Sequence, residues 1–318
     1  MVNNYEVEQM KDNLRISIAL SSSKEYLKYV QVMLRSLFES NADQCFDIYL
    51  VYMGNRKRDL DEIRNIVEKE YGHRFFPLDV PGEIYNVARK DNSKVWNPIV
   101  WYRWSIIDLI PMNVERILLL GLDIIVKGSI SDFYFQSFEE YWFCMCPDMY
   151  MKYSYERSQS IMNAASKRGI DASKEYYNAD VVLINLTECR KHICTKSMIE
   201  AGIKNSFECM DQDMINYTFH SNIKSCDTFL YNYVPGLKID MPDYKRRIDD
   251  AIIVHYAGVK DKPWKKFCET GPNQLWWYYA KKTAYYEQMR KEAIRYTKKM
   301  KRGGFRHKLK TCLRRRKG

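Results

Sequence analysis

A carboxylate stands at the end of a strongly apolar stretch. Residues 117–120 predict a buried strand, and Gly121-Leu122-Asp123 predicts a tight corner before a second apolar run at 124–126. An acidic side chain is rarely buried in such a segment without a partner, because desolvating its charge is costly. Asp123 is therefore either a ligand of a hard metal ion or a turn residue that caps the next element, and this stretch alone does not decide between them.

His255 is a second candidate ligand. It follows a short apolar strand predicted at 251–254 and precedes Gly258, with Lys260 and Lys262 close behind. An imidazole can bind a divalent cation while lysines offset phosphate charge, so this group fits a metal bound to a phosphorylated ligand. The alternative is a hydrogen-bonded histidine of the core.

Arg103 is a cation inside an aromatic segment, flanked by Trp101, Tyr102 and Trp104. A guanidinium in such surroundings either stacks on the rings as a structural residue or binds a phosphate. We favour binding.

The elements that must position these residues alternate in type. Apolar runs at 15–20, 46–53 and 74–80 predict strands, and the periodic segments 26–39 and 59–71 predict helices between them. Strands alternating with helices at this spacing are typical of a doubly wound α/β sheet, which binds ligands beyond the carboxyl ends of its strands. The loops at 21–23 and 121–123 are both such ends, so we expect them to face one crevice.

The second half of the chain continues this pattern. We expect a helix at 96–110 ended by Pro111, strands at 141–146 and 176–186, and a helix at 187–201 capped by Thr187 and stopped at Gly202. Asp211-Gln212-Asp213 opens a further helix. Acidic residues suit the first turn of a helix, so capping alone would explain this trio.

The segment from Arg116, Arg-Ile-Leu-Leu-Leu-Gly-Leu-Asp-Ile-Ile-Val, resembles the Asp-x-Asp segment of family 8 glycosyltransferases. These retaining enzymes use nucleotide sugars and include bacterial lipopolysaccharide galactosyl- and glucosyltransferases and glycogenin. The family segment reads approximately Arg-x-Leu-Tyr-Leu-Asp-x-Asp-Ile-Ile-Val. Asp123 matches the second Asp, and Gly121 stands where the first Asp belongs.

Three more segments resemble the same family, in the same order. Residues 176–186 are similar to Tyr-Phe-Asn-Ala-Gly-Val-Leu-Leu-Ile-Asn-Leu, with Asn178 kept and Asp180 in place of the Gly. Residues 211–213 match its Asp-Gln-Asp. The segment from His255 resembles His-x-x-Gly-x-x-Lys-Pro-Trp with one extra residue, so Lys260 is a possible substitute for Lys262. Together the four segments cover about 15–265.

The resemblance implies a role for each matching residue. It assigns Asp123 and His255 to a Mn²⁺ or Mg²⁺ ion, Asp211 to sugar hydroxyls, and Gln212 to the space beneath the anomeric carbon, while Asp213 is expected to be structural. It places the remaining matches in the binding site for a UDP-sugar: Ser21, Ser23, Tyr26, Arg103, Asn178, Gly258 and Lys262. Ser23 stands where the family has an acidic residue and can hydrogen-bond a base only without charge assistance.

Two departures fall at the implied metal site. Gly121 removes one expected carboxylate, although magnesium sites often use only one or two carboxylates beside phosphates and water. Asp180 adds a carboxylate, and we count it with Asp211 and Gln212 among the catalytic candidates. It could replace the missing ligand from a different strand or hold an acceptor hydroxyl. The alternative to an active enzyme is a catalytically impaired member that binds a nucleotide sugar or a glycan.

Positive charge is concentrated toward the end of the 318-residue chain. The net charge is +11, and residues from 281 onward hold 16 Lys or Arg against two Glu, which leaves −3 for residues 1–280. We expect a long aromatic and basic helix at 274–300, broken at Gly303-Gly304. This composition fits the interface of an anionic membrane. A solvated tail and an RNA-binding segment are the alternatives, and nucleic acid is not expected because the body is acidic.

Other features bear on location. No apolar run is long enough for a transmembrane helix, the first residues lack the apolar core of a signal peptide, and the nine scattered cysteines suit reduced thiols in a cytosol. We therefore expect a cytoplasmic protein, peripheral on the inner face of the cell membrane.

These observations give one combined prediction. The fold is an α/β, GT-A-type, Rossmann-like mixed sheet flanked by helices over 14–268, followed at 269–318 by a helical basic appendage that anchors to a membrane surface. The activity is metal-assisted transfer of glucose or galactose from a UDP-sugar to a glycan or glycolipid acceptor of the bacterial cell envelope, with retention of configuration. No hydrolase-type pair of carboxylates is evident.

Overall fold

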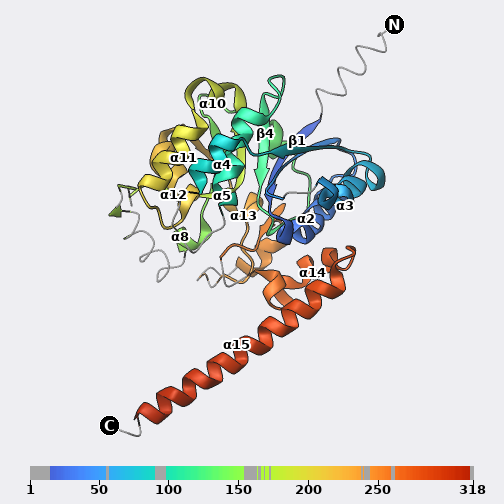
Figure 1. The fold of residues 1–318 in the computed structure, drawn as a ribbon, viewed down its shortest axis with the longest axis vertical. Helices are drawn as coiled ribbons and strands as arrows, with labels where there is room; N and C mark the ends of the chain where they lie inside the picture. Colours follow the sequence, from blue (N-terminus) through green and yellow to red (C-terminus); the bar gives the residue numbers. More distant parts are fainter. Residues whose placement is uncertain are drawn as a thin grey trace. The chain divides into compact units, whose positions relative to one another are not determined.

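A mixed sheet of seven strands, in the order β3-β2-β1-β4-β7-β6-β8, forms the centre of the first part of the chain (Figure 1). Four strands are parallel to one another: β1 (Ile16–Ser22), β2 (Phe46–Tyr52), β3 (Arg74–Asp79) and β4 (Arg116–Leu120). Strand β7 (Tyr177–Asn185) runs antiparallel to both of its neighbours, β4 and β6 (Phe143–Pro147). Strand β8 (Ile223–Ser225) is parallel to β6. Because β1 and β4 are parallel neighbours, their carboxyl ends lie at the same edge of the sheet. Residues 21–23 and 121–123 lie at or just after these ends, as the sequence predicts.

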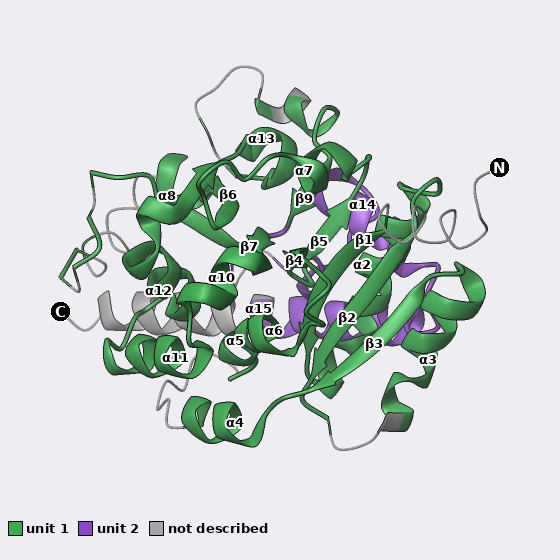
Figure 2. Cartoon of the chain, turned by 90° about the horizontal axis from the view of Figure 1, so that it is seen from above, with its two compact units in different colours: residues 1–255 green, residues 256–318 purple. Residues whose placement is uncertain are grey.

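The computed structural model forms two compact units, Met1–His255 and Tyr256–Gly318, coloured separately in Figure 2. It describes residues 15–54, 57–89, 98–153, 163, 166, 167, 169–171, 173–237, 239, 244–258 and 262–315. Most of the segment 150–174, which has no clear periodicity, and the start of the helix predicted at 96–110 lie outside these residues.

Alternating side chains give the sheet two apolar faces. Leu118 belongs to one hydrophobic cluster and Leu119 to the other, as do Cys144 and Met145 on β6, because successive residues of a strand point to opposite faces. Helices α2 (Leu27–Glu39), α3 (Asp61–Arg64) and α7 (Ser131–Phe135) cover the first cluster. The second is covered by α4 (Gly82–Ala88), α5 (Ile99–Tyr102), α6 (Ile106–Leu109), α10 (Leu186–His192), α11 (Thr195–Lys204) and α12 (Met210–Thr218).

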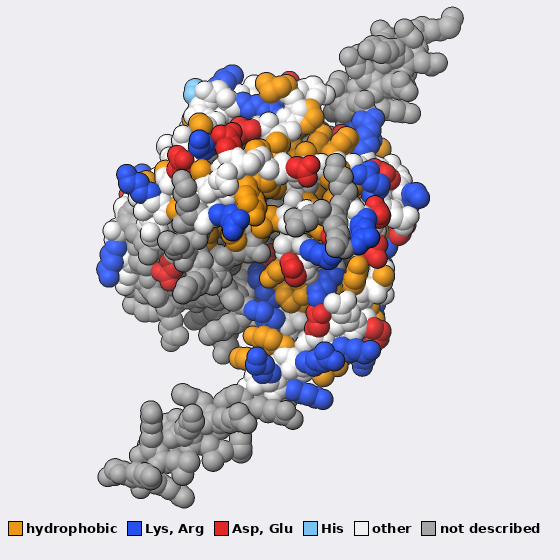
Figure 3. All heavy atoms as spheres, in the orientation of Figure 1, with side chains coloured by type: hydrophobic (Ala, Val, Ile, Leu, Met, Phe, Trp, Pro, Cys, Tyr) orange, Lys and Arg blue, Asp and Glu red, His pale blue; other side chains and the backbone are white. Residues whose placement is uncertain are grey.

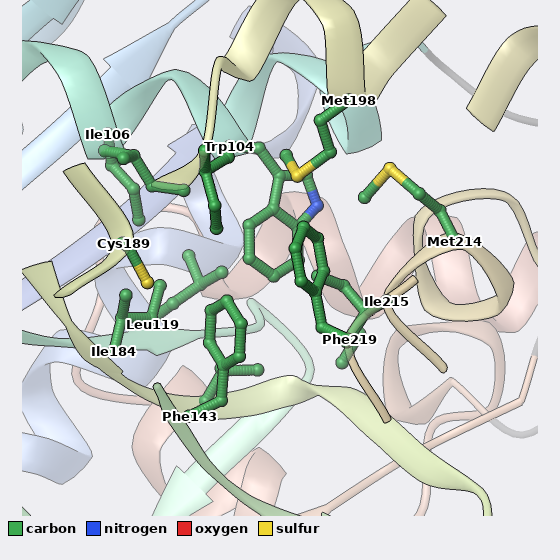
Figure 4. Packing of buried hydrophobic residues seen from close by; sticks show 14 of the residues in the cluster. Trp104, Ile106, Leu119, Phe143, Ile184, Cys189, Met198, Met214, Ile215 and Phe219 are labelled. Carbon is green, nitrogen blue, oxygen red and sulfur yellow. The ribbon is translucent and has the colours of Figure 1, made fainter. Parts of the chain in front are cut away.

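Large aromatic side chains fill the second cluster. Trp104 packs edge-to-face against Phe143, and the ring of Phe219 lies tilted against the Phe143 ring (Figure 4). Trp104 comes from the 3₁₀ turn Arg103–Ser105 between α5 and α6, which is the middle of the predicted helix. This packing fixes the backbone on which Arg103 stands.

A small second sheet carries the last site residue. Strand β5 (Ile124–Val126) pairs antiparallel with β9 (Ile253–His255), and Ile124 lies opposite His255. His255 is therefore brought next to Asp123, which directly precedes β5.

The helix predicted at 187–201 is wrong in its boundaries. Two helices, α10 and α11, replace it, and the side chain of Asn185 caps α10 by accepting from Glu188 N at 3.2 Å, in place of Thr187. Gly202 lies inside α11, where a Cβ would come within 2.7 Å of the Trp101 ring. The glycine thus serves close packing and does not end the helix.

The second unit contains α14 (Gln274–Ala280) and α15 (Tyr286–Arg315). Trp276 and Trp277 are buried and pack against Trp264 and Phe267 of the same unit. The prediction of one helix at 274–300, broken at Gly303-Gly304, is wrong in two places. The chain leaves the helical conformation before Tyr286, and α15 continues through Gly303-Gly304. A glycine lowers helix stability by about 1 kcal/mol relative to alanine, which does not by itself end a helix.

Candidate active site

Two carboxylates and an imidazole meet at the edge of the sheet where β4 ends. His255 Nε2 lies 3.2 Å from Asp123 Oδ2 and 3.4 Å from Asp180 Oδ2. One donor atom from each of the three residues lies within 4.8 Å of the others. Asp123 and His255 are buried, and Asp180 is partly exposed.

Strand pairing explains this convergence. The ladder between β4 and β7 places Leu120 opposite Val181, and one residue further Gly121 N donates to the Asp180 carbonyl at 2.8 Å. Asp180 therefore lies across the ladder from the Gly121 corner, while the β5–β9 register supplies His255.

His255 is held in one orientation by Asn232. The Nδ1 atom of His255 lies 2.8 Å from Asn232 Oδ1. An amide oxygen can only accept, so Nδ1 carries a proton and Nε2 faces the carboxylates. Burial alone would lower the pKa of His255, but Asp123 and Asp180 outweigh burial and raise that pKa to about 9. We did not identify Asn232 from the sequence, although it is the one amide of the apolar and aromatic segment 230–234.

The donor set fits a hard divalent cation. Carboxylate oxygens and an imidazole nitrogen are ligands of Mn²⁺, and atoms bound to one six-coordinate ion of this size lie roughly 3 Å apart. The contacts of His255 Nε2 with both carboxylates are close to that spacing. The Asn232 contact supplies the outer hydrogen bond that metal-bound histidines usually make.

Arg103 links two of the predicted site residues. Its Nη1 donates to Asp180 Oδ1 at 2.7 Å and its Nε to Asp211 Oδ2 at 2.6 Å. Trp104 Nε1 also donates to Asp211 Oδ2, at 2.9 Å. Burial opposes the charge of Arg103, but the two carboxylates raise its pKa and keep it charged. These contacts give Arg103 a structural role, and its predicted phosphate contact stays a prediction.

Gln212 is oriented by contacts at both ends of its amide. Its Oε1 accepts from Asn178 Nδ2 at 3.1 Å and from Ala179 N at 3.2 Å, and its Nε2 donates to Asp148 Oδ2 at 3.1 Å. Asn178 also donates to Asp148, and its Oδ1 accepts from Asp180 N. A chain of hydrogen bonds therefore runs from Gln212 to the carboxylate cluster.

Asp148 is the residue of this network that sequence reasoning missed. It follows β6 directly, and Tyr150 N and Met151 N donate to its Oδ1 at 2.9 and 3.1 Å. An acidic residue after a buried strand was the available signal, since the same signal singled out Asp123. Asp213, expected to be structural, accepts from Tyr176 Oη and Cys209 N.

Three residues predicted to bind the nucleotide lie at the carboxyl end of β1 and just after it. Ser21 lies within β1, and Ser23, just after it, donates through Oγ to Glu25 Oε2 at 2.8 Å. The Tyr26 ring is 44% exposed and packs edge-to-face against Tyr29. Stacking of Tyr26 on a base stays a prediction.

Gly258 and Lys262 belong to the second unit. Gly258 has a φ of +88°, which favours glycine, and Lys262 Nζ donates to Tyr256 O at 3.3 Å. Lys260, the possible substitute for Lys262, lies outside the described residues.

Comparisons with known proteins identify the family of this chain. The family model described as "Glycosyl transferase family 8" matches residues 17–268. "Glycosyltransferase GlyF" of Streptococcus pneumoniae is 23% identical over 84% of this chain and 61% of its own length. A "Lipopolysaccharide 1,2-glucosyltransferase" of Escherichia coli is 26% identical over 54% of this chain and 51% of its own length. The chain thus spans about half to three fifths of these two relatives.

Solved structures share the fold. The galactosyltransferase LgtC, crystallised with donor and acceptor sugar analogues, superposes with a TM-score of 0.68 at 19% identity over 85% of this chain and 96% of its own. The glycosyltransferase GlyE of Streptococcus pneumoniae gives 0.60 at 20% identity, over 87% of this chain and 63% of its own. The predicted fold class, a mixed α/β sheet flanked by helices with a helical C-terminal region, is confirmed.

Proposed function

The chain belongs to glycosyl transferase family 8, and we propose that it transfers a hexose, glucose or galactose, from a UDP-sugar to a glycan or glycolipid of the bacterial cell envelope. The observation that carries the proposal is the meeting of Asp123, Asp180 and His255 at the sheet edge, next to the Arg103–Asp211 pair. The envelope acceptor is proposed because relatives are named lipopolysaccharide 1,2-glucosyltransferase and lipopolysaccharide 1,3-galactosyltransferase.

Asp123 and His255 would hold Mn²⁺ or Mg²⁺, which offsets the negative charge of the departing diphosphate. Asn232 keeps Nε2 of His255 turned toward this position. Because such transfer depends on positioning and charge stabilisation, the buried and fixed side chains are suited to it.

Asp211 and Gln212 would hold the donor sugar. Arg103 and Trp104 fix the Asp211 carboxylate, and Asp148 fixes the Gln212 amide. Among the described residues Gln212 Nε2 makes one hydrogen bond, which leaves its second hydrogen for a sugar oxygen. A polar group held at the reacting carbon, with retention of configuration as in the family, is the mechanism we propose.

Enzymatic assays test this function. UDP release should be measured with a panel of UDP-hexoses and envelope glycan acceptors, with Mn²⁺ and with EDTA, for the wild type, Asp123→Asn and the exposed control Asp43→Asn. We expect one UDP-hexose to give metal-dependent release that Asp123→Asn abolishes and Asp43→Asn leaves intact. NMR of the product reports its anomeric configuration. Metal-dependent UDP binding without transfer from any donor would favour the catalytically impaired alternative.

We further propose that the second unit binds an anionic membrane surface, on the cytoplasmic face. Tyr278 and Tyr296 are 53% and 38% exposed and lie among basic residues, Lys281, Lys282, Arg290, Lys291, Arg295, Lys298 and Lys299. Figure 3 shows Lys and Arg side chains gathered over the described part of α14 and α15. Within the described residues no helix is long and apolar enough to cross a membrane. Aromatic and basic side chains together suit attachment to a bilayer surface.

Vesicle sedimentation tests this attachment. The protein should pellet with vesicles that contain phosphatidylglycerol but not with phosphatidylcholine alone. Binding should weaken when NaCl rises from about 0.1 to about 0.5 M, because salt screens surface charge. Equal binding to both vesicles, or an RNA mobility shift at physiological salt without vesicle binding, would refute it.

A further inference from the structure

We propose that Asp180 supplies the metal-ligating carboxylate that position 121 lacks, so that the ligands come from the β4–β5 corner, β7 and β9. The inference rests on the proposed metal-assisted function and names the third protein ligand of its metal. It also decides between the two roles that the sequence left open for Asp180, a replacement ligand or a group that holds an acceptor hydroxyl.

The first argument is the space around Gly121. A Cβ built on Gly121 would lie 3.0 Å from Asp180 Cβ, 3.1 Å from Asp180 Cγ and 3.0 Å from Asp123 Oδ1. A side chain at 121 would therefore point at the place that the Asp180 side chain occupies. Position 121 and position 180 compete for one space, and in this chain the carboxylate stands on 180.

The second argument is the backbone between the two positions. Gly121 N donates to Asp180 O at 2.8 Å and extends the β4–β7 ladder by one residue. Neighbouring positions across a ladder are close enough for a side chain on one strand to reach a site beside the other. A carboxylate can therefore move from β4 to β7 without a change of fold.

The third argument is how Asp180 uses its two oxygens. Oδ1 accepts from Arg103 Nη1 at 2.7 Å, and Oδ2 faces His255 Nε2 at 3.4 Å. One oxygen is anchored and the other points into the same cluster as Asp123, which is the arrangement of a ligand that binds through a single oxygen. A residue that held an acceptor hydroxyl would instead need an oxygen directed away from this cluster.

One consequence is a link between metal and sugar. Arg103 contacts both Asp180 and Asp211, so the third metal ligand shares a guanidinium with the residue predicted to hold the donor sugar. The link between the metal position and the sugar position therefore runs through Asp180 and Arg103.

Mn²⁺ binding without donor or acceptor tests the inference, measured by calorimetry and by EPR of free Mn²⁺. The variants are Asp180→Asn, Asp180→Gly, Gly121→Asp and the double exchange Gly121→Asp/Asp180→Gly, each checked for folding by near-UV circular dichroism. Asp180→Asn keeps an oxygen that can accept the hydrogen bond from Arg103 and turns an amide nitrogen toward the cluster, so it removes the metal-binding oxygen and the charge but not this hydrogen bond.

We expect Asp180→Asn and Asp180→Gly each to weaken Mn²⁺ binding by at least about tenfold, and the double exchange to restore most of this loss. Mn²⁺ affinity that Asp180→Asn leaves unchanged would overturn the inference, as would a folded double variant that binds no better than Asp180→Gly. If the wild type binds Mn²⁺ through Asp180 but transfers no sugar, the proposed function fails and the inference stands. If transfer needs Mn²⁺ but Asp180→Asn binds it normally, the inference alone fails.

Discussion

Asp148 accepts a hydrogen bond from Gln212 Nε2 at 3.1 Å, and this contact determines which end of the Gln212 amide faces which neighbour. The same oxygen, Oδ2, accepts from Asn178 Nδ2, while Oδ1 accepts two backbone N–H groups. Asp148 is thus a positioning residue for Gln212, the side chain that we propose to lie beneath the anomeric carbon of the donor.

Asp148→Asn should lower kcat. Asparagine can keep Oδ1 for the backbone but presents an NH₂ group to two donors, Asn178 and Gln212, which forces the Gln212 amide to turn. We expect kcat to fall by at least about tenfold, because a misplaced polar group loses stabilisation made only in the transition state. Steady-state kinetics check this, with the exposed Asp132→Asn as control. An unchanged kcat would show that Gln212 does not need this partner.

Arg103→Met should destabilise the first unit strongly. It leaves Asp211 and Asp180 without their shared cation, and removing one partner of a buried ion pair costs about 3–5 kcal/mol. The matched control is Arg64→Met, which removes a partly exposed (i, i+4) pair with Glu68 worth about 0.3–0.5 kcal/mol. Urea unfolding measures both free energies. Equal losses in the two variants would contradict the structural role of Arg103.

Gly202→Ala should be destabilising although alanine favours helices. The added Cβ would lie 2.7 Å from the Trp101 ring and 3.2 Å from Met214 Sδ. Overpacking of this kind costs about 1–3 kcal/mol. Gly82→Ala is the control, since a Cβ there meets nothing within 4 Å, and thermal melts compare the two. A more stable Gly202→Ala protein would mean that the helix packs differently against Trp101.

Stability should fall as His73 becomes protonated in acid. Burial, followed by the charge of Arg15, lowers its pKa from 6.5 to about 4, and the ring packs against Phe38 and Phe46. Between these values the unfolded chain binds the proton and the folded chain does not. The contribution of His73 is therefore present above about pH 6.5 and is lost as the pH falls toward about 4.

The pH dependence of urea unfolding checks this prediction. His73→Gln should flatten the stability profile between about pH 6.5 and pH 4, since it removes the group that titrates there. Carboxylates also titrate at the acid end, so the difference between wild type and variant is the quantity to compare. Identical profiles would show that His73 titrates normally in the folded protein.

Local signals in the sequence predict the sheet well. Strands such as β4 and β7 are nearly continuous apolar runs, and Asp123 and His255 stand out because each is a polar residue at the end of one. These features depend on a few neighbouring residues, so they can be recognised without the structure. The break between α10 and α11 and the continuation of α11 through Gly202 depend on distant contacts. These two features could not be recognised from the sequence.

The same distinction applies to the site. Asp180 lies beside Asp123 because β4 pairs antiparallel with β7. Asn232 orients His255 because a loop lies beside β9. Neither the pairing nor the loop position is encoded in local periodicity. Asp148 carried a usable signal as the first residue after β6, but its partners Asn178 and Gln212 come from elements far along the chain.

Calorimetric titration of UDP into the purified protein tests the central claim most directly, first with Mn²⁺ and then with EDTA. The account predicts saturable binding with Mn²⁺ that weakens by at least about tenfold when the metal is removed, because Asp123, Asp180 and His255 would hold the ion that offsets the charge of the diphosphate. Binding of equal affinity in EDTA, or no UDP binding in the presence of Mn²⁺, would contradict a metal-assisted nucleotide-sugar site at this edge of the sheet.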